Sequence, residues 1–237
     1  MLRNQTLSAM PPDVIGRIFP SLTQREASRG EVLIAQGDTV KTVAFPATAS
    51  VRNVVTFSDG RSAETFVTGV EGVTGLIPFL ADAPCAWSVE VKAAGALYEL
   101  PASVLRHVFE DSPALRRQLL RLANDYQTQS SLGVACTAVH QATGRLADLL
   151  LINAERSLSD LVPLTQEDLA SLLGVQRTTV NASAIELKSA GAIKYSRGRI
   201  HILDRDALVR NACECHALRG SLNLSADARA QAVSEGH

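Results

Sequence analysis

Two groups of residues in this chain have side chains that could do chemistry. The first begins in the stretch VQRTTVNA, residues 175–182, where Arg177 and Asn181 stand in a polar run. An arginine can bind a guanine edge through two hydrogen bonds, and an asparagine can bind an adenine edge in the same way. The N-terminal residues of a recognition helix are those that reach base edges. The stretch therefore predicts a helix that contacts DNA bases in the major groove.

Positive charge is concentrated around this stretch. Between Gln176 and Arg199 five basic residues stand beside one acid, Glu186, although the whole chain has a net charge of −1. Phosphate attraction comes from such local clusters. Thr165, which begins the preceding helix, could seat a phosphate on backbone N–H groups, and Arg199 could clamp another. The predicted DNA contacts are Thr165, Gln176, Arg177, Thr178, Asn181, Lys188, Arg197 and Arg199.

The second group consists of cysteines and histidines. Cys136 and His140 are four residues apart, so a helix would place both on one face, and a two-Cys, two-His metal site across a dimer axis is conceivable. Such pairs more often fill a core. Cys213 and Cys215 would point about 200° apart on a helix and could not ligate one ion, although a frayed segment could allow redox sensing. We therefore expect no metal and no cofactor.

The elements around residues 175–182 have the spacing of a helix-turn-helix. Thr165 and Asp168 form a capping pair for a helix that should end at Gly174. A short turn then leads to a second helix, whose Val180 and Leu187 would pack inward together with Ala184. Residues 191–203 predict a strand, a turn at Arg197 and Gly198, and another strand, which together make a wing. Residues 204–216 predict a closing helix.

The first half of the chain has a different texture. Residues 11–28 predict one or two short helices. Between residues 30 and 100 several short alternating runs are separated by turn signals, of which Asp59-Gly60 is the clearest hairpin signal. Such runs predict a small antiparallel roll. The fold class is therefore α+β: an antiparallel β-roll, a long helix and a winged helix-turn-helix.

A long helix should follow Pro113. Its residues Leu115, Leu119, Leu122 and Tyr126 recur like a coiled-coil seam. We expect the seam to pack against a second copy in a homodimer, with an ordinary intramolecular core helix as the alternative. The predicted divisions are residues 1–112 for the roll, 113–139 for the dimerisation helix, 140–216 for the winged domain and 217–237 for a mobile tail.

The composition excludes several classes of protein. Apolar residues make up 46% of the 237 residues, which is ample for a core. The chain shows no signal-peptide pattern and no apolar run long enough to span a membrane. Four cysteines are too few for a disulfide framework, so a reducing cytoplasm is expected. No paired carboxylates, Ser-His-Asp set or phosphate loop points to an enzyme.

The layout resembles the Crp/Fnr family of bacterial transcription regulators over roughly residues 12–210. The resemblance is strongest in LTQEDLASLLGVQRTTV (164–180), with further matches in SPAL (112–115) and TGRLADLL (143–150). It implies a cyclic-nucleotide-binding-like jelly roll, and DNA and RNA polymerase as partners. Arg177 matches the family's first base-contacting arginine. Thr178 and Ala182 replace a glutamate and a second arginine, which implies a different operator.

The same resemblance bears on the effector. Family members that bind cyclic nucleotides carry a glutamate for the ribose and an arginine for the phosphate, but Leu76 and Trp87 stand at these positions. A buried phosphate needs such a cation. The pocket could instead hold a less charged ligand or be filled by its own side chains. The matching effector positions are Gly75, Leu76, Trp87, Ser88, Ser130 and Ser131.

These observations predict a homodimeric regulator that binds a pseudo-palindromic operator, with a sensor that does not bind cyclic AMP. The alternative is a regulator activated by cyclic AMP or cyclic GMP. A protein-protein scaffold that uses the winged domain is a third possibility. The Fnr-type N-terminal cysteine cluster is absent, because the first cysteine is Cys85. Haem sensing is known in the family, but no residue marks it here.

Overall fold

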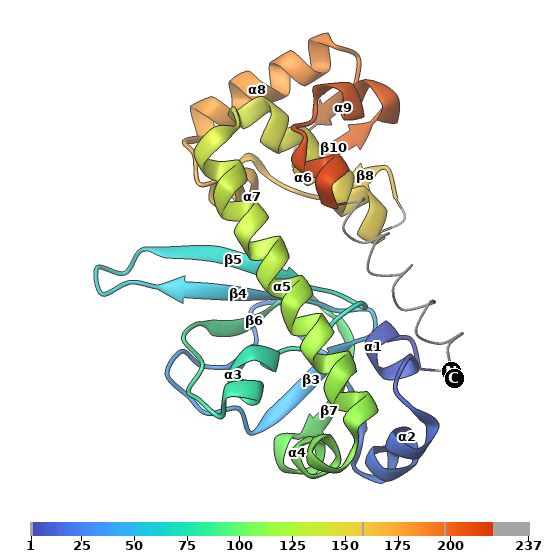
Figure 1. Cartoon of the computed structure of the whole chain (residues 1–237). Coiled ribbons are helices and arrows are strands. Elements are labelled where there is room, and N and C mark those ends of the chain that lie inside the picture. Colours follow the sequence, from blue (N-terminus) through green and yellow to red (C-terminus); the bar gives the residue numbers. More distant parts are fainter. Residues whose placement is uncertain (1, 158, 197, 220–237) are drawn as a thin grey trace. The chain divides into compact units, whose positions relative to one another are not determined.

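The structure, a computed structural model, describes residues 2–157, 159–196 and 198–219. The chain divides into two compact units at Ser130 and Ser131, within the long helix α5 (Pro113–Val139) (Figure 1). Each unit has a hydrophobic core of its own. The predicted tail lies mostly at 220–237, outside the described residues. No helix in the described ranges is long and apolar enough to cross a membrane.

The first unit is built on two antiparallel sheets, with strand orders β1-β7-β3 and β2-β6-β4-β5. Their strands are β1 (Thr23–Ala27), β2 (Val32–Ile34), β3 (Thr42–Pro46), β4 (Ser50–Thr56), β5 (Ser62–Thr68), β6 (Ser88–Ala93) and β7 (Gly95–Pro101). The helical elements are α1 (Gln5–Ser8), α2 (Pro12–Ile18), the 3₁₀ turn η1 (Phe19–Ser21), α3 (Leu76–Ala81) and α4 (Ala102–Asp111). The predicted roll is present in the structure.

The predicted hairpin at Asp59-Gly60 is confirmed. Strands β4 and β5 pair from Thr56 and Ser62 back to Val51 and Thr68. Gly60 has a φ of 83°, a left-handed conformation that glycine adopts at no steric cost. Turn chemistry and strand alternation agree here, and the local sequence was sufficient to predict the hairpin.

The helical prediction for residues 11–28 is only partly correct. Helix α2 ends at Ile18 and η1 at Ser21. Residues 23–27 form strand β1, which pairs antiparallel with residues 95–99 of β7. Pairing with β7 satisfies the backbone groups of β1 that face that strand, and no helix is needed for them. The partner strand lies more than 60 residues away in sequence, so the local pattern did not reveal it.

The predicted seam of α5 packs inside its own chain. Leu115 and Leu119 are fully buried in the core of the first unit, and Leu122 and Tyr126 pack against that core. The Tyr126 hydroxyl accepts a hydrogen bond from the Val73 amide at 2.9 Å. This stripe therefore packs as an intramolecular core helix, which was the alternative prediction. The roll supplies the apolar surface that we had expected from a second copy.

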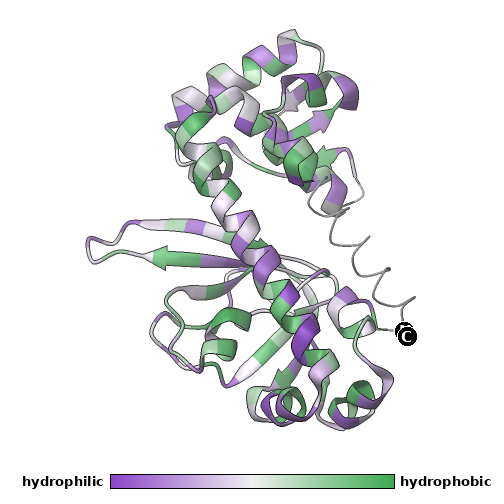
Figure 2. Ribbon diagram, viewed as in Figure 1, coloured by the Kyte–Doolittle hydropathy of each residue, from purple (hydrophilic) through white to green (hydrophobic). Residues whose placement is uncertain are grey.

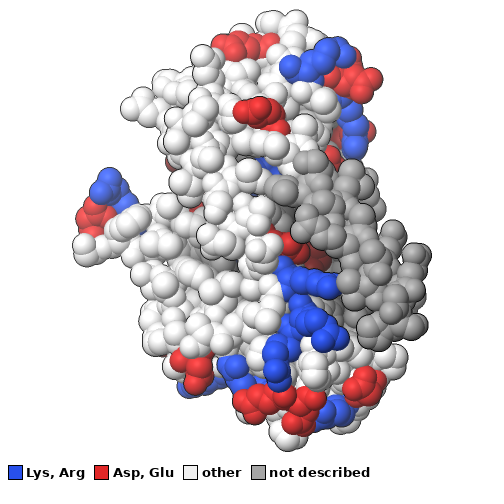
Figure 3. Space-filling view, viewed as in Figure 1, with Lys and Arg blue, Asp and Glu red and all other residues white. Residues whose placement is uncertain are grey.

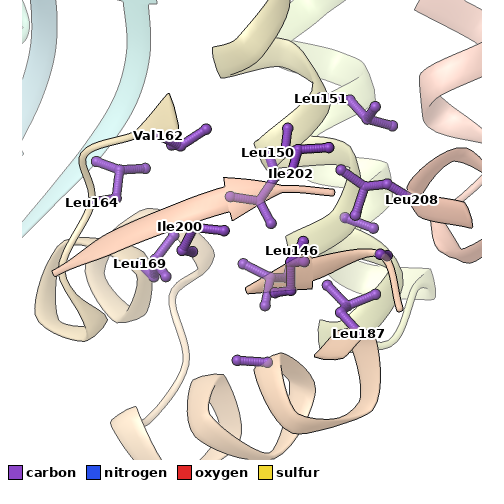
Figure 4. Packing of buried hydrophobic residues seen from close by; sticks show 14 of the residues in the cluster. Leu146, Leu150, Leu151, Val162, Leu164, Leu169, Leu187, Ile200, Ile202 and Leu208 are labelled. Carbon is purple, nitrogen blue, oxygen red and sulfur yellow. The ribbon is translucent and has the colours of Figure 1, made fainter. Parts of the chain in front are cut away.

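The second unit contains the last turns of α5 and the predicted winged helix-turn-helix. Its elements are α6 (Ala142–Ser157), β8 (Leu161–Val162), α7 (Gln166–Leu173), α8 (Arg177–Ser189), β9 (Ile193–Ser196), β10 (Arg199–Ile202) and α9 (Arg205–Asn211). The strands form a sheet of order β8-β10-β9. Leu146 and Leu150 of α6 meet Leu187 of α8 and Ile200 of β10 in one core (Figure 4).

The closing helix is shorter than predicted. Helix α9 ends at Asn211, and Ala212 is extended, with φ −71° and ψ 152°. Helical backbone resumes only at residues 215–219. The segment that carries Cys213 and Cys215 therefore crosses a break, which invalidates the prediction that a continuous helix directs these two thiols away from each other.

Candidate nucleic-acid interface

Helix α7 begins and ends as its sequence predicts. The Thr165 hydroxyl accepts a hydrogen bond from the Asp168 amide at 3.1 Å, and the Asp168 carboxylate accepts one from the Thr165 amide at 2.9 Å. This reciprocal capping box fixes the first turn. Gly174 ends the helix in the left-handed conformation, with a φ of 63°. Both ends of α7 are thus set locally, so the turn into α8 has a defined geometry.

Helix α8 has one buried and one exposed face. Val180, Ala184 and Leu187 are buried, as predicted. Arg177, Thr178, Asn181 and Lys188 are exposed, together with the N-cap residue Gln176. Figure 2 shows the resulting mixture of apolar and polar residues along α8. The exposed, polar face of α8 is the one whose side chains could enter a DNA groove.

Side chains of α7 hold two of the predicted base-contacting residues. The Arg177 guanidinium lies 3.0 Å from the Glu167 carboxylate, and both side chains are mostly exposed. The Gln166 amide donates to the Asn181 side-chain oxygen at 3.3 Å. Exposed pairs of this kind contribute about 0–1 kcal/mol, so DNA can replace them at little cost. They orient Arg177 and Asn181 without removing them from solvent.

The capping box limits what Thr165 can do for a phosphate. Its amide and its hydroxyl are both engaged with Asp168. A phosphate at this helix start would then have to be bound by the amides of Gln166 and Glu167, the two residues that follow Thr165. Thr165 stays in the predicted contact set, but its first role is to begin α7.

The wing is a short hairpin of β9 and β10. Arg199 pairs with Ser196 across the two strands and is exposed, as is Lys194. Gly198 lies in the turn with a φ of 76°. Arg197, the other predicted wing contact, lies outside the described residues. The hairpin therefore presents cations of its own beside those of α8.

Two residues of α6 that the sequence did not single out hold α8 and the end of α7. The Thr143 hydroxyl donates to the Glu186 carboxylate at 2.6 Å and lies 3.1 Å from the Ser183 hydroxyl. The Arg145 guanidinium donates to the Leu173 carbonyl at the end of α7. Both residues belong to the TGRLADLL stretch, which was the available signal. Glu186, the one acid between Gln176 and Arg199 in the sequence, is thus engaged with α6.

The predicted effector residues of the first unit lie among packed apolar side chains. Leu76 is buried in the main core, and Trp87 packs against the cluster of Ile34, Val51, Cys85 and Val89. Gly75 begins α3 with a φ of 67°, and a side chain there would collide with Ile34. Ser88 is half-buried and accepts from the Gln36 amide at 3.2 Å. Ser130 and Ser131 are exposed, on opposite sides of the unit boundary.

The cations of the larger sheet are engaged by carboxylates. Arg52 lies 2.9 Å from Glu90, and Lys92 lies 2.8 Å from Glu64.

A pocket of about 230 Å³ opens in the first unit, but none of the predicted effector residues lines it. Its walls are Thr39, Val40, Pro78, Phe79, Asp82, Ala83, Ala102, Ser103 and Arg106. The Trp87 indole N–H is buried and has no hydrogen-bond partner among the described residues. Figure 3 shows further Lys and Arg side chains gathered over the first part of α5, with acids nearby.

The second group of reactive side chains converges in the second unit. The ligand atoms of Cys136, His140, Cys213 and Cys215 all lie within 4.8 Å of one another. Burial, together with the neighbouring thiols of Cys213 and Cys215, raises the pKa of Cys136 to about 12. Burial also raises the pKa of Cys213.

Two family models match the sequence, in the order in which the structure places the two units. A cyclic nucleotide-binding domain matches residues 24–112, and a Crp-like helix-turn-helix domain matches residues 144–210. The first match covers the roll, and the second runs from the first turn of α6 into the end of α9. Neither match includes the long helix α5 or the segment after α9.

Whole-chain comparisons agree with these matches. A protein of Mycobacterium tuberculosis named "CRP-like cAMP-activated global transcriptional regulator" is 23% identical over 219 residues, which are 90% of this chain and 98% of that protein. FixK2 from Bradyrhizobium japonicum is similar in structure, with a TM-score of 0.71 at 18% identity, over 81% of this chain and 98% of that one.

The Xanthomonas campestris protein CLP, described as a c-di-GMP-responsive global regulator, has a TM-score of 0.69 at 14% identity, over 82% of this chain and 100% of that one. At these identities the structural likeness shows only the fold, and the family assignment rests on the two domain matches. With a cyclic nucleotide-binding domain followed by a Crp-like helix-turn-helix, this chain belongs to the Crp/Fnr family of transcription regulators.

Proposed function

We propose that the protein is a homodimeric regulator that binds a pseudo-palindromic DNA operator in the cytoplasm and acts on RNA polymerase there. The observation that carries the proposal is the exposed face of α8, where Arg177 and Asn181 are oriented by α7 beside a basic wing. Arg177 would bind a guanine, and Asn181 an adenine. Gln176, Thr178 and Lys188 complete the contact surface.

A second face of α5 supports the homodimer. In the first unit Leu120 of α5 is 51% exposed, and in the second unit Val134 and Val139 are 73% and 75% exposed. These side chains are distinct from the buried Leu115 and Leu119. Apolar side chains that a long helix presents to solvent are typical of a helix that pairs with a second copy. The partner would then contact the side of α5 that carries Leu120, which we call its outer face.

Selection of bound DNA tests the function. The full chain should retain genomic fragments that share two inverted half-sites, with centres about 34–36 Å apart along the duplex. Mutating one half-site in a recovered fragment should weaken binding more than mutating a flanking position. If no fragment is enriched over input DNA while the protein is folded and dimeric, the winged domain serves as a protein-protein module instead.

Arg199→Ala separates phosphate contacts from base contacts. The wing arginine would clamp a phosphate, so its removal should weaken binding to all DNA sequences about equally and lower the salt-dependence slope by roughly one. Fluorescence anisotropy with operator and unrelated duplexes, over a series of salt concentrations, measures both quantities. Weaker binding to the operator alone would instead assign Arg199 to base contacts.

We also propose that the sensor does not bind cyclic AMP. Supporting this, Leu76 and Trp87 are packed among apolar side chains, and Arg52 and Lys92 are paired with carboxylates. The alternative, activation by a cyclic nucleotide, is favoured by the domain match at residues 24–112 and by the name of the mycobacterial relative. The unpartnered Trp87 indole N–H also offers a ligand one donor.

Calorimetry decides between these two sensors. Titration of the full chain with cyclic AMP and with cyclic GMP should give no saturable heat at micromolar concentration, because a phosphate buried without a cation is strongly disfavoured. Buffer injections, and 5′-AMP as a noncyclic control, exclude heats of dilution and general nucleotide binding. A saturable micromolar isotherm for either cyclic nucleotide would establish the alternative.

A further inference from the structure

Four potential metal ligands converge at the end of α5. Cys136 lies in the last turn of α5, and His140 follows directly after that helix. Cys213 and Cys215 come from the segment beyond α9. The Cys136 and Cys213 sulfurs are 3.5 Å apart, and the Cys215 sulfur lies 3.5 Å from Nδ1 of His140. All three thiols are at least largely shielded from solvent, and His140 is half-buried.

We propose that Cys136, His140, Cys213 and Cys215 form a mononuclear zinc site. Three cysteines and one histidine are an established ligand set for structural zinc. With Zn–S bonds of about 2.3 Å, a tetrahedral site places its sulfurs about 3.8 Å apart, close to the separation seen here. Because the four ligand atoms lie within 4.8 Å of one another, they surround a space for one ion. A multi-iron cluster, which places its cysteines on different irons, would need them more widely spread.

The surroundings of the four ligands fit the proposal. With Nδ1 directed to the ligand cluster, the Nε2 of His140 lies 3.6 Å from the Glu214 carboxylate. A ligating histidine commonly donates its second N–H to such a carboxylate, which fixes its tautomer and orientation. The incomplete burial of His140 leaves a path for the ion to enter.

The backbone brings the two halves of the cluster together. The Cys213 amide donates to the Gly144 carbonyl of α6 at 3.2 Å. A side chain at position 144 would lie 3.3 Å from that amide, closer than most such contacts, so glycine allows this approach. The extended Ala212 breaks the helix before Cys213 and lets both thiols of the Cys-Glu-Cys segment face Cys136 and His140. The expectation of no metal rested partly on a continuous helix at Cys213 and Cys215, and partly on the frequency with which a Cys and a His four residues apart fill a core.

Bound zinc would cross-link the end of α5 to the segment beyond α9. Metal that binds only the folded state stabilises it by its binding free energy. The ion would therefore stabilise the second unit, which holds α8 and the wing, without touching any predicted DNA contact. The site shares no residue with the predicted effector positions, and its test requires no DNA.

Metal analysis of the untagged full chain, purified under reducing conditions, tests the proposal. We expect about one zinc ion per chain after dialysis, and an X-ray absorption spectrum with three sulfur ligands and one nitrogen ligand. Cobalt substitution should give a thiolate charge-transfer band and the intense visible bands of a tetrahedral site. These measurements use the unaltered chain and do not depend on any variant remaining folded.

Variants assign the ligands. Cys213→Ser and His140→Ala should lose stoichiometric zinc, whereas Cys85→Ala and His107→Ala, in the first unit, should retain it. Glu214→Gln should keep the site but bind zinc about 10- to 100-fold more weakly in a chelator competition. Circular dichroism identifies any variant that fails to fold.

Three results would overturn the site. One is wild-type protein that contains no zinc and takes up none at micromolar concentration. Another is a disulfide between Cys136 and Cys213 in protein prepared without oxygen, detected by mass spectrometry. The third is iron in place of zinc, or zinc bound mainly through oxygen ligands.

Discussion

Arg177→Ala should reduce the preference of the protein for its operator over unrelated DNA by about 5- to 150-fold at each half-site. This range follows because a bidentate bond between an arginine and a guanine contributes about 1–3 kcal/mol of discrimination. Arg177 is exposed at the first position of α8 and bonded only weakly to Glu167, so the guanidinium is available and its removal leaves no cavity. The fold should therefore persist while base discrimination disappears.

Competition binding with operator and unrelated duplexes at one salt concentration gives this ratio directly. Arg210→Ala is the charge-matched control, because Arg210 is an exposed arginine of α9 that belongs to no predicted contact. It removes the same charge and should leave the ratio unchanged. An unaltered operator preference in Arg177→Ala would remove Arg177 from the base contacts and shift attention to Asn181.

Leu119→Ala should destabilise the first unit by about 2–5 kcal/mol, because Leu119 is 0% exposed in the core and its truncation leaves a cavity. The adjacent Leu120 is 51% exposed, so Leu120→Ala should change the unfolding free energy little. If α5 pairs with a second copy through its outer face, Leu120→Ala should instead weaken the dimer. Urea unfolding and sedimentation equilibrium separate the two effects.

The reverse outcome would contradict the packing described for α5. If Leu119→Ala dissociated the dimer and left unfolding unchanged, the originally predicted seam would be the true interface. If Leu120→Ala had no effect on dimer dissociation, the proposed outer face would be wrong. Both positions carry leucine and are adjacent in the helix, so the two variants differ only in whether the removed side chain points into the core or to solvent.

The winged unit was predictable because its signals are local. The capping box of Thr165 and Asp168, the left-handed Gly174 and the inward spacing of Val180 and Leu187 each follow from a few adjacent residues. Tertiary contacts do not override such signals easily, since turn chemistry and helix capping act within one or two turns. The positioning roles of Thr143 and Arg145 were missed because their partners lie on other helices.

The incorrect predictions for α5, β1 and the cysteines have a common cause. Periodicity in α5 revealed that Leu115 and Leu119 are buried, but it could not show what covers them. Strand β1 depends on β7, a partner far along the chain. The convergence of Cys136 with Cys213 spans 77 residues and also requires the break after α9. Contacts between residues so far apart in the chain leave no periodic or turn pattern in the local sequence.

The early end of α9 has a consequence for how this protein could change over time. Among the described residues, the last buried member of the winged unit's main apolar cluster is Leu208, and the family match to that unit ends at residue 210. Residues 213–219 lie beyond both, yet Cys215 is buried and Arg219 pairs with the buried Asp148 of α6. A lineage that lost this segment would keep the recognition helix and the wing, but it would also have to replace Asp148, because its carboxylate would otherwise be buried without its arginine.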